Sequence, residues 1–491
     1  MDRLIAVLVT AALALPASAA TWTYNVREVT AGRLQIAAEM PGGPLHIIRG
    51  MERFVSNVRA AGKPIVRDGD RWIVPRCATA CRVEWTFALA DAAAAFHDIE
   101  LARDFGDAIE SPPGSWLLRP DNDPDRVRLH VTTGEGRYFV SGMPLAGEDY
   151  LSRDFPRDVY SAFGKLEITK IGPIDLAIIR NGHALETSLL RKWVTNAKRS
   201  IETYYGSFPV EHALLLVRIG QSRGIDGGTA MGGGGAAIMI AVGEQNRAED
   251  FDTDWQLTHE MTHLTFPSVE RQHHWIEEGI ATYVEPVART QAGLYPAKDM
   301  WAELEEGLPK GLPQAGDRGL DHTHTWGRTY WGGALYCFLA DVEIRRQTSN
   351  RFGLQDALAA IMRGGGTIDQ EWDLEKALTI GDTATETHVL MTLYRSMADA
   401  PHPVDIGAVF RTLDKAIRRA IEGAPQAPSP AGSRRNGAGA SPAHQGTMSL
   451  HARPRTFPRR LALTKTGSHR SPAVSRLRVG SCRRGSAVAG R

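Results

Sequence analysis

A chain of 491 residues that is 43% hydrophobic and 23% charged can bury more than one core, so we expect two or three domains. The formal net charge of +1 hides an asymmetry, because residues 424–491 hold 13 Lys and Arg residues and no Asp or Glu. The rest of the chain keeps 44 of the 57 basic residues against all 56 acidic ones. An acidic body of this kind argues against nucleic-acid binding.

The N-terminus, residues 1–20, has the pattern of a secretory signal peptide. Arg3 precedes an apolar run from Leu4 to Leu15, and Ala17-Ser18-Ala19 resembles a cleavage site of small residues. A membrane anchor is the alternative, but the run is too short to span a bilayer. The sequence therefore predicts export, to a periplasm or beyond, with no transmembrane segment left after signal cleavage.

Four cysteines are too few for a disulfide scaffold. Cys77 and Cys81 are close enough to bridge across a tight turn, which an oxidising compartment would permit. A zinc site at this pair is weakly supported, because no second pair with metal-ligand spacing accompanies it. Cys337 lies on an apolar helical stripe and is predicted to be a small core residue.

Residues 21–164 predict an all-β domain, either a sandwich or a saddle-like sheet. Short runs of alternating character are separated by clusters of Gly, Pro, Asp and Asn, such as Pro41-Gly42-Gly43. No catalytic group of residues appears in this part. The predicted strands are Trp22–Val29, Arg33–Met40, Arg71–Val74, Arg82–Ala88, Val127–Thr133 and Arg137–Ser141.

Residues 165–290 change to a mixed α/β pattern. Apolar residues recur every four positions between Leu189 and Tyr205, which is one face of an amphipathic helix. The predicted strands around it are Leu166–Ile171, Ile174–Arg180 and Ala213–Ile219.

A glycine-dense segment, residues 227–235, follows these strands. It lacks the Gly-Lys-Ser/Thr ending of a phosphate-binding loop. One interpretation is a flexible turn. The other is a close backbone approach, in which an extended substrate pairs with the next strand, Ala236–Val242. The second interpretation assigns substrate binding to Gly232, Gly233, Gly234 and Gly235.

The segment His259-Glu260-Met261-Thr262-His263 predicts a metal site on a helix. The two histidines are four residues apart and therefore lie on one helical face, where both reach one ion. Glu260 is rotated by about 100° from His259, towards a metal-bound water rather than the metal. Such a pentapeptide occurs by chance in roughly 3% of chains of this length, so the third ligand decides the prediction.

The third ligand is sought on the next helix. Phe266 and Val269 stand where a metzincin would have Gly and His, which excludes that class. Instead, Trp275 opens a second predicted helix that carries both Glu277 and Glu278. Only one of these two carboxylates need be the ligand.

The stretch Trp275-Ile276-Glu277-Glu278-Gly279-Ile280-Ala281 resembles the Trp-x-x-Glu-Gly-x-Ala stretch of gluzincin metallopeptidases. These are the aminopeptidase N superfamily and the related glycyl aminopeptidase family. The resemblance implies a thermolysin-like α/β zinc peptidase domain with one zinc ion, held by His259, His263 and Glu278, and leaves Glu277 as the weaker candidate. It implies that Glu260 is the general base.

The segment Thr329-Tyr330-Trp331-Gly332-Gly333 is similar to the start of the helix that carries the family's catalytic tyrosine, which corresponds to Tyr330. The resemblance covers roughly residues 166–421 and departs from the family at two points. Only 14 residues separate His263 from Glu278, fewer than in the superfamily. The superfamily's amine-binding Glu is missing, because Gly232 and Gly233 follow Met231 at the equivalent place. Aminopeptidase specificity is therefore not implied.

Residues 291–422 predict a helical lobe that carries Tyr330, and residues 423–491 a basic, disordered tail. The predicted helices at the end of the lobe are Leu354–Met362, Glu371–Leu378, Thr387–Met397 and Leu413–Ile421. The expected fold is a multidomain α+β protein: β-rich domain, zinc peptidase domain, helical lobe.

The predicted function is an exported zinc metallopeptidase that acts on a peptide or protein substrate. Two alternatives stay open. One is a catalytically silent peptide-binding protein of the same fold, and the other is a zinc hydrolase of a non-peptide substrate. The pairs His322/His324 and His273/His274 are predicted to be loop histidines. The sequence does not indicate an oligomeric state.

Overall fold

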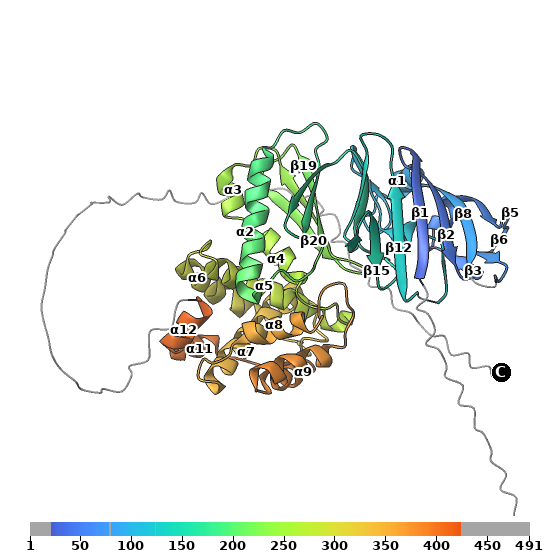
Figure 1. Cartoon of the computed structure of the whole chain (residues 1–491). Coiled ribbons are helices and arrows are strands. Elements are labelled where there is room, and N and C mark those ends of the chain that lie inside the picture. The colour runs from blue at the N-terminus through green and yellow to red at the C-terminus, as the bar shows by residue number, and fades with distance from the viewer. Residues whose placement is uncertain (1–20, 78–79, 123, 424–491) are drawn as a thin grey trace, which may run out of the picture. The chain divides into compact units, whose positions relative to one another are not determined.

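The computed structural model describes residues 21–77, 80–122 and 124–423 (Figure 1). The predicted signal peptide and the predicted basic tail lie outside the described residues. All described residues fall within one compact unit that extends to Pro425, so the finer domain boundaries stay a prediction. Within the described part, no helix is long and apolar enough to cross a membrane.

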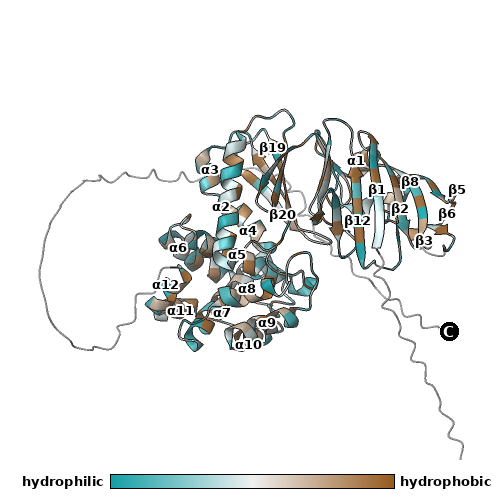
Figure 2. Ribbon diagram, in the orientation of Figure 1, coloured by the Kyte–Doolittle hydropathy of each residue, from teal (hydrophilic) through white to brown (hydrophobic). Residues whose placement is uncertain are grey.

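The N-terminal strands build three sheets in the described residues. In the largest sheet, hydrophobic and hydrophilic residues alternate along the strands, because one face of each strand packs into the core (Figure 2). Its strand order is β14 (Leu145–Ala146), β15 (Asp149–Ser152), β12 (Arg126–Thr132), β1 (Thr21–Thr30), β2 (Arg33–Met40), β8 (Cys81–Ala88), β4 (Val55–Ala60) and β5 (Lys63–Pro64).

The two smaller N-terminal sheets have four strands each. One has the order β13 (Tyr138–Ser141), β16 (Ser161–Gly164), β10 (Ala108–Glu110) and β9 (Arg103–Asp104). The other has the order β11 (Arg119–Pro120), β3 (Gly43–His46), β7 (Arg71–Val74) and β6 (Arg67–Asp68).

The six strands predicted from the sequence are confirmed to within two residues. The expectation of an all-β domain is wrong in one place, because the alanine-rich segment Leu89–Phe96 forms helix α1, which packs on β9 and β2.

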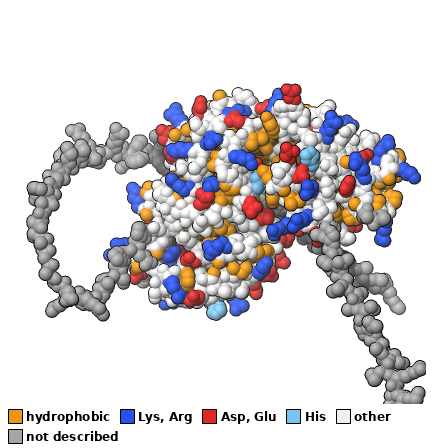
Figure 3. Space-filling view, in the orientation of Figure 1, with side chains coloured by type: hydrophobic (Ala, Val, Ile, Leu, Met, Phe, Trp, Pro, Cys, Tyr) orange, Lys and Arg blue, Asp and Glu red, His pale blue; other side chains and the backbone are white. Residues whose placement is uncertain are grey.

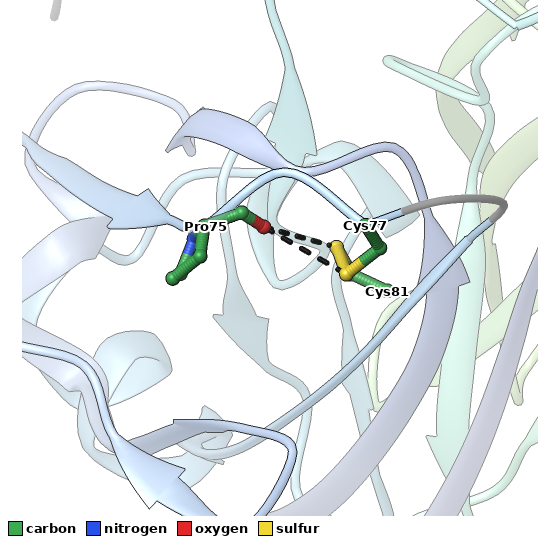
Figure 4. Close-up of a disulfide and its surroundings, with 3 residues drawn as sticks. All are labelled: Pro75, Cys77 and Cys81. Carbon is green, nitrogen blue, oxygen red and sulfur yellow. Dashed lines mark hydrogen bonds between the residues drawn. A yellow bond between two sulfur atoms is a disulfide. The ribbon is translucent and has the colours of Figure 1, made fainter.

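A disulfide joins Cys77 to Cys81, with a Cα–Cα distance of 5.4 Å. Both sulfurs face the carbonyl oxygen of Pro75, at 3.7 and 3.2 Å (Figure 4). Cys337 is fully buried, as its place on an apolar helical stripe predicted.

A five-stranded sheet follows, with the order β17 (Glu167–Ile171), β18 (Ile174–Ile179), β19 (Ala213–Gly220), β21 (Ala237–Gly243) and β20 (Ile225–Met231). Its inner strands are parallel and covered on both faces, which explains their continuous apolar sequence. In β19, Leu214 and Leu216 join the core of the N-terminal strands, whereas Leu215 and Val217 join the helical core. The edge strand β20 is antiparallel to β21.

Helices cover the other face of this sheet (Figure 1). Helix α2 (Thr187–Tyr205) buries the stripe that was predicted from its four-residue period. The remaining helices are α3 (Ala248–Asp252), α4 (Gln256–His263), α5 (His274–Gln291), α6 (Ala297–Gly307), α7 (Gly333–Gln347), α8 (Leu354–Arg363), α9 (Leu374–Thr385), α10 (Val389–Met397), α11 (Ile406–Thr412) and α12 (Lys415–Ile421). The α+β fold class is thus confirmed.

The charges of the surface are mixed. On the face that Figure 3 shows, acidic and basic side chains are interspersed over the strand-rich and the helical parts.

Candidate active site

Helices α4 and α5 bring His259, His263 and Glu278 together. One ligand atom of each residue lies within 4.8 Å of the other two. Oε2 of Glu278 is 3.3 Å from Nε2 of His259 and 3.7 Å from Nε2 of His263. Two imidazole nitrogens and one carboxylate oxygen on converging helices are the ligand set of a catalytic zinc ion, with a further position open to water. The residues present therefore fit zinc.

Helix α4 is fixed at its N-terminus by Asp254. This carboxylate accepts hydrogen bonds from the backbone N–H groups of Gln256 and Leu257, both at 3.1 Å. Leu257 is buried in the core, whereas Trp255 is 51% exposed. The reason is its position four residues before His259, which places it on the histidine face of α4.

Helix α5 is anchored where it begins. The Asp321 carboxylate accepts hydrogen bonds from the Trp275 indole N–H at 2.6 Å and from the Tyr394 hydroxyl at 3.2 Å, and Nδ1 of His273 lies 2.9 Å from it. Burial by itself lowers the pKa of His273, but Asp321 raises it above the usual value. This arrangement fixes the turn of α5 that precedes Glu278.

The sequence predicted that His274 lies in a loop, and this prediction is wrong. His274 is the first residue of α5. Its Nε2 is 3.3 Å from Oε1 of Glu278, and its Nδ1 is 3.0 Å from Oε2 of Glu277. Burial alone would lower the pKa of His274, but these two carboxylates raise it to about 10. His274 thus binds the Glu278 oxygen that faces away from His259 and His263. A spacing of four residues on one helix was the signal that could have revealed this.

The charge of Glu278 is stabilised by three histidines. Burial opposes ionisation, but His263 and hydrogen bonds from His259 and His274 hold the pKa of Glu278 well below its usual range. Glu277 differs, because burial raises its pKa although His274 opposes the shift. The structure thus turns Glu278, and not Glu277, towards the two histidines of α4.

The side chain of Glu260, a residue of α4, lies against the edge strand β20. A Cβ on Gly228 would come within 2.8 Å of this side chain, so a larger residue there would displace the carboxylate. The Ala230 backbone donates a hydrogen bond to the carboxylate. Burial raises the pKa of Glu260 to about 7, although His259 opposes this shift. A carboxyl group with this pKa exchanges protons readily near neutral pH.

Tyr330 lies in a π-helical turn, Gly327–Gly332, that leads into α7. π-Helical turns are rare and frequently mark functional sites. The tyrosine ring stacks on His259, with ring centroids 6.3 Å apart and planes 18° apart. Burial and the Glu278 charge, with which the hydroxyl forms a hydrogen bond, raise the pKa of Tyr330. The phenol therefore stays protonated and available as a hydrogen-bond donor beside the histidine–glutamate cluster.

Gly279 allows α5 to approach α7. A Cβ at Gly279 would lie 2.3 Å from the carbonyl carbon of Gly333, and one at Gly333 would lie 2.1 Å from the Trp275 carbonyl oxygen. The helix that Gly279 faces is thus the one that follows Tyr330. This contact sets the distance between Glu278 and Tyr330.

The edge of β21 is not available to a substrate, because β20 occupies it. The prediction that a peptide pairs with residues 236–242 is therefore wrong. Gly232, Gly233, Gly234 and Gly235 pack closely instead: a Cβ at each would come near Ile368, Asp158, Pro156 or Gly142, at 2.1 to 3.3 Å. The glycine that faces the site is Gly228.

A further carboxylate, that of Glu110 in β10, is buried among the N-terminal strands. Glu110 pairs with Ala162, and Tyr160 lies two residues before Ala162, hence on the same face of the sheet. The Tyr160 hydroxyl lies next to Thr229 and within electrostatic range of both Glu110 and Glu260. Glu110 is fully buried without a well-formed side-chain hydrogen bond, and burial raises its pKa well above the usual value.

The loop histidines after Asp321 are solvent-exposed, as expected. Nε2 of His322 is 2.9 Å from Oδ1 of Asp399, and both side chains are exposed. His324 is exposed as well.

No protein-family model matches the sequence, and no curated protein matches it at a significant level. Solved structures do match. An aminopeptidase N family protein from Idiomarina loihiensis aligns over 71% of this chain and 72% of its own, with 12% sequence identity and a TM-score of 0.54. The chain has the aminopeptidase N fold.

An M1 zinc metallopeptidase from Deinococcus radiodurans aligns over 79% of this chain and 95% of its own, with 14% identity and a TM-score of 0.46. The Idiomarina loihiensis structure confirms, at the level of the fold, the resemblance to the aminopeptidase N superfamily that the sequence motifs indicated. Identities this low concern the fold alone.

Proposed function

We propose that this chain with the aminopeptidase N fold is an exported, zinc-dependent metallopeptidase. The observation that carries the proposal is the convergence of His259, His263 and Glu278 beside Glu260 and Tyr330. The first three residues can hold a zinc ion, Glu260 has a pKa suited to a general base, and Tyr330 stays protonated as a hydrogen-bond donor. The Cys77–Cys81 disulfide fits export to an oxidising compartment.

A zinc ion at His259, His263 and Glu278 would polarise the scissile carbonyl and lower the pKa of a bound water towards about 7. Glu260 would accept the proton of the attacking water and deliver it to the leaving amine. The Tyr330 hydroxyl would donate a hydrogen bond to the oxygen that becomes negative in the transition state. The free edge of β20 would align the peptide backbone by strand pairing.

Two measurements on the purified chain test this proposal. Metal analysis should find one zinc ion per chain. A peptide library, with free and with blocked N-termini, should then be hydrolysed by the zinc-loaded protein. Full zinc without any turnover would favour a peptide-binding protein or a hydrolase of a non-peptide substrate.

The blocked peptides also decide between endopeptidase and aminopeptidase action. The glycine-dense segment has no carboxylate that could hold a substrate amine. Strict aminopeptidase action is therefore not implied by this segment. Cleavage of blocked peptides at the rate of free ones would exclude it.

The third zinc ligand is tested by alanine variants of the two adjacent glutamates. We expect Glu278→Ala to lose zinc, because two histidines alone hold the ion weakly, whereas Glu277→Ala should keep it. Zinc content after dialysis at neutral pH measures the difference. Full zinc in the Glu278 variant would contradict the assignment.

His274 is expected to position Glu278. His274→Ala should bind zinc about 10–100-fold more weakly, the usual effect of removing a group that orients a metal ligand. Competition with a chelator measures the affinity. His274→Gln keeps a hydrogen-bond donor and should restore most of it. Equal zinc affinity in the wild type and the alanine variant would show that Glu278 needs no such support.

A further inference from the structure

Two large exposed side chains flank the candidate active site. Trp255 is 51% exposed and Trp326 is 64% exposed. Burying the large apolar area of an indole stabilises a protein or a complex, and an exposed tryptophan leaves much of this stabilisation available to a ligand. Other exposed hydrophobic side chains, such as Tyr138 and Ile168, lie on outlying strands. These two tryptophans instead each contact a residue of the site.

The contacts form a row of four rings. The Trp255 and His259 centroids are 5.6 Å apart with the rings edge-on, and the His259 and Tyr330 centroids are 6.3 Å apart with the rings stacked. Tyr330 in turn stacks on Trp326 at 6.0 Å, with the planes 26° apart. The inner rings belong to the residues that would hold zinc and donate to the substrate. The outer rings are the exposed ones.

The backbone explains this order. Trp255 and His259 are one helical turn apart, with Trp255 at the residue that precedes α4. Trp326 and Tyr330 are also four residues apart, across the beginning of the π-helical turn. Each tryptophan is therefore held beside its partner by local geometry. A substrate whose scissile carbonyl lies between His259 and Tyr330 meets an indole on either side.

We propose that Trp255 and Trp326 each line one side of the substrate site, and that at least one of these indoles takes an aromatic side chain of the peptide, at one of the two residues that flank the scissile bond. This inference rests on the proposed function and names its substrate class. Aromatic side chains gain from offset or edge-to-face packing beyond their buried area. We therefore expect peptides with Phe at that position to be preferred over peptides with Ala by about tenfold or more.

The test compares short peptides that differ only in Phe, Leu, Lys or Ala on either side of the scissile bond. Their affinities are measured by calorimetry on the zinc-loaded Glu260→Gln protein, which does not depend on turnover. Their kcat and KM values are measured on the wild type. The expected result is a preference for Phe at one position that is expressed mainly in KM.

The decisive variants are Trp255→Ala and Trp326→Ala, each with its zinc content measured. We expect at least one of them to reduce the ratio of Phe to Ala affinities about tenfold, with full zinc retained. Trp326→Phe keeps an aromatic ring and should restore most of the preference. Tyr138→Ala, which removes an exposed ring on β13 that contacts none of the site residues named above, is the matched control and should change nothing.

The outcomes separate the two proposals. An unchanged ratio in both alanine variants, or a preference for Lys over Phe, would overturn the aromatic subsite. Binding that prefers Phe, in a wild type that hydrolyses none of the peptides, would remove the peptidase proposal but keep the subsite. Hydrolysis of all the peptides without a preference for Phe would keep the peptidase proposal but remove the aromatic subsite.

Discussion

Replacing Glu260 by glutamine should leave zinc binding intact and reduce peptide hydrolysis by about 10²–10⁴-fold or more, the contribution typical of general acid–base catalysis. The amide has nearly the same shape as the carboxylate but cannot accept the proton of the attacking water. The measurement is kcat on a peptide substrate, together with the zinc content of the same preparation.

Glu277→Gln is the matched control for this experiment. It removes a nearby carboxylate that contacts His274. This carboxylate is turned away from the two histidines of α4. We expect its kcat to stay within a fewfold of the wild type. Hydrolysis by Glu260→Gln at the wild-type rate would show that another group takes the proton.

Replacing Gly279 by alanine should destabilise the protein by about 1–3 kcal/mol or more, the usual cost of overpacking. The new methyl group would lie 2.3 to 2.4 Å from backbone atoms of Gly333, which can yield only if α5 and α7 separate. In a helix without such a contact, alanine would instead stabilise by about 1 kcal/mol. The sign of the change in the free energy of unfolding therefore shows whether α5 and α7 are in contact.

Chemical denaturation of the zinc-loaded protein measures this change. Gly220→Ala is the control, because a Cβ there meets nothing within 4 Å, and its effect should stay within about 0.5 kcal/mol. Gly333→Ala should destabilise as Gly279→Ala does, since it meets the same contact from the other helix. A stabilised Gly279→Ala protein would show that α5 and α7 are farther apart. Because Glu278 precedes Gly279, we also expect weaker zinc binding in this variant.

Much of the fold could be read from local patterns. Alternation identified the strands Arg33–Met40 and Arg71–Val74 at their observed bounds, and a four-residue period identified α2. Helix α1 was missed because its alanines resemble neither an alternating strand nor an amphipathic stripe. The edge strand β20 was missed because glycine favours turns. Its pairing with β21 depends on a neighbour that no local pattern contains.

The components of the candidate site could be predicted from the sequence. The four-residue spacing of His259 and His263 placed them on one helical face, and the motif around Glu278 predicted a third ligand. Tertiary structure alone decided how these components meet. Whether Glu277 or Glu278 faces the histidines, that His274 binds the second oxygen of Glu278, and that Trp255 and Trp326 border the site all depend on the distances between helices. Those distances are set by close contacts such as that of Gly279 with Gly333, between residues far apart in the chain.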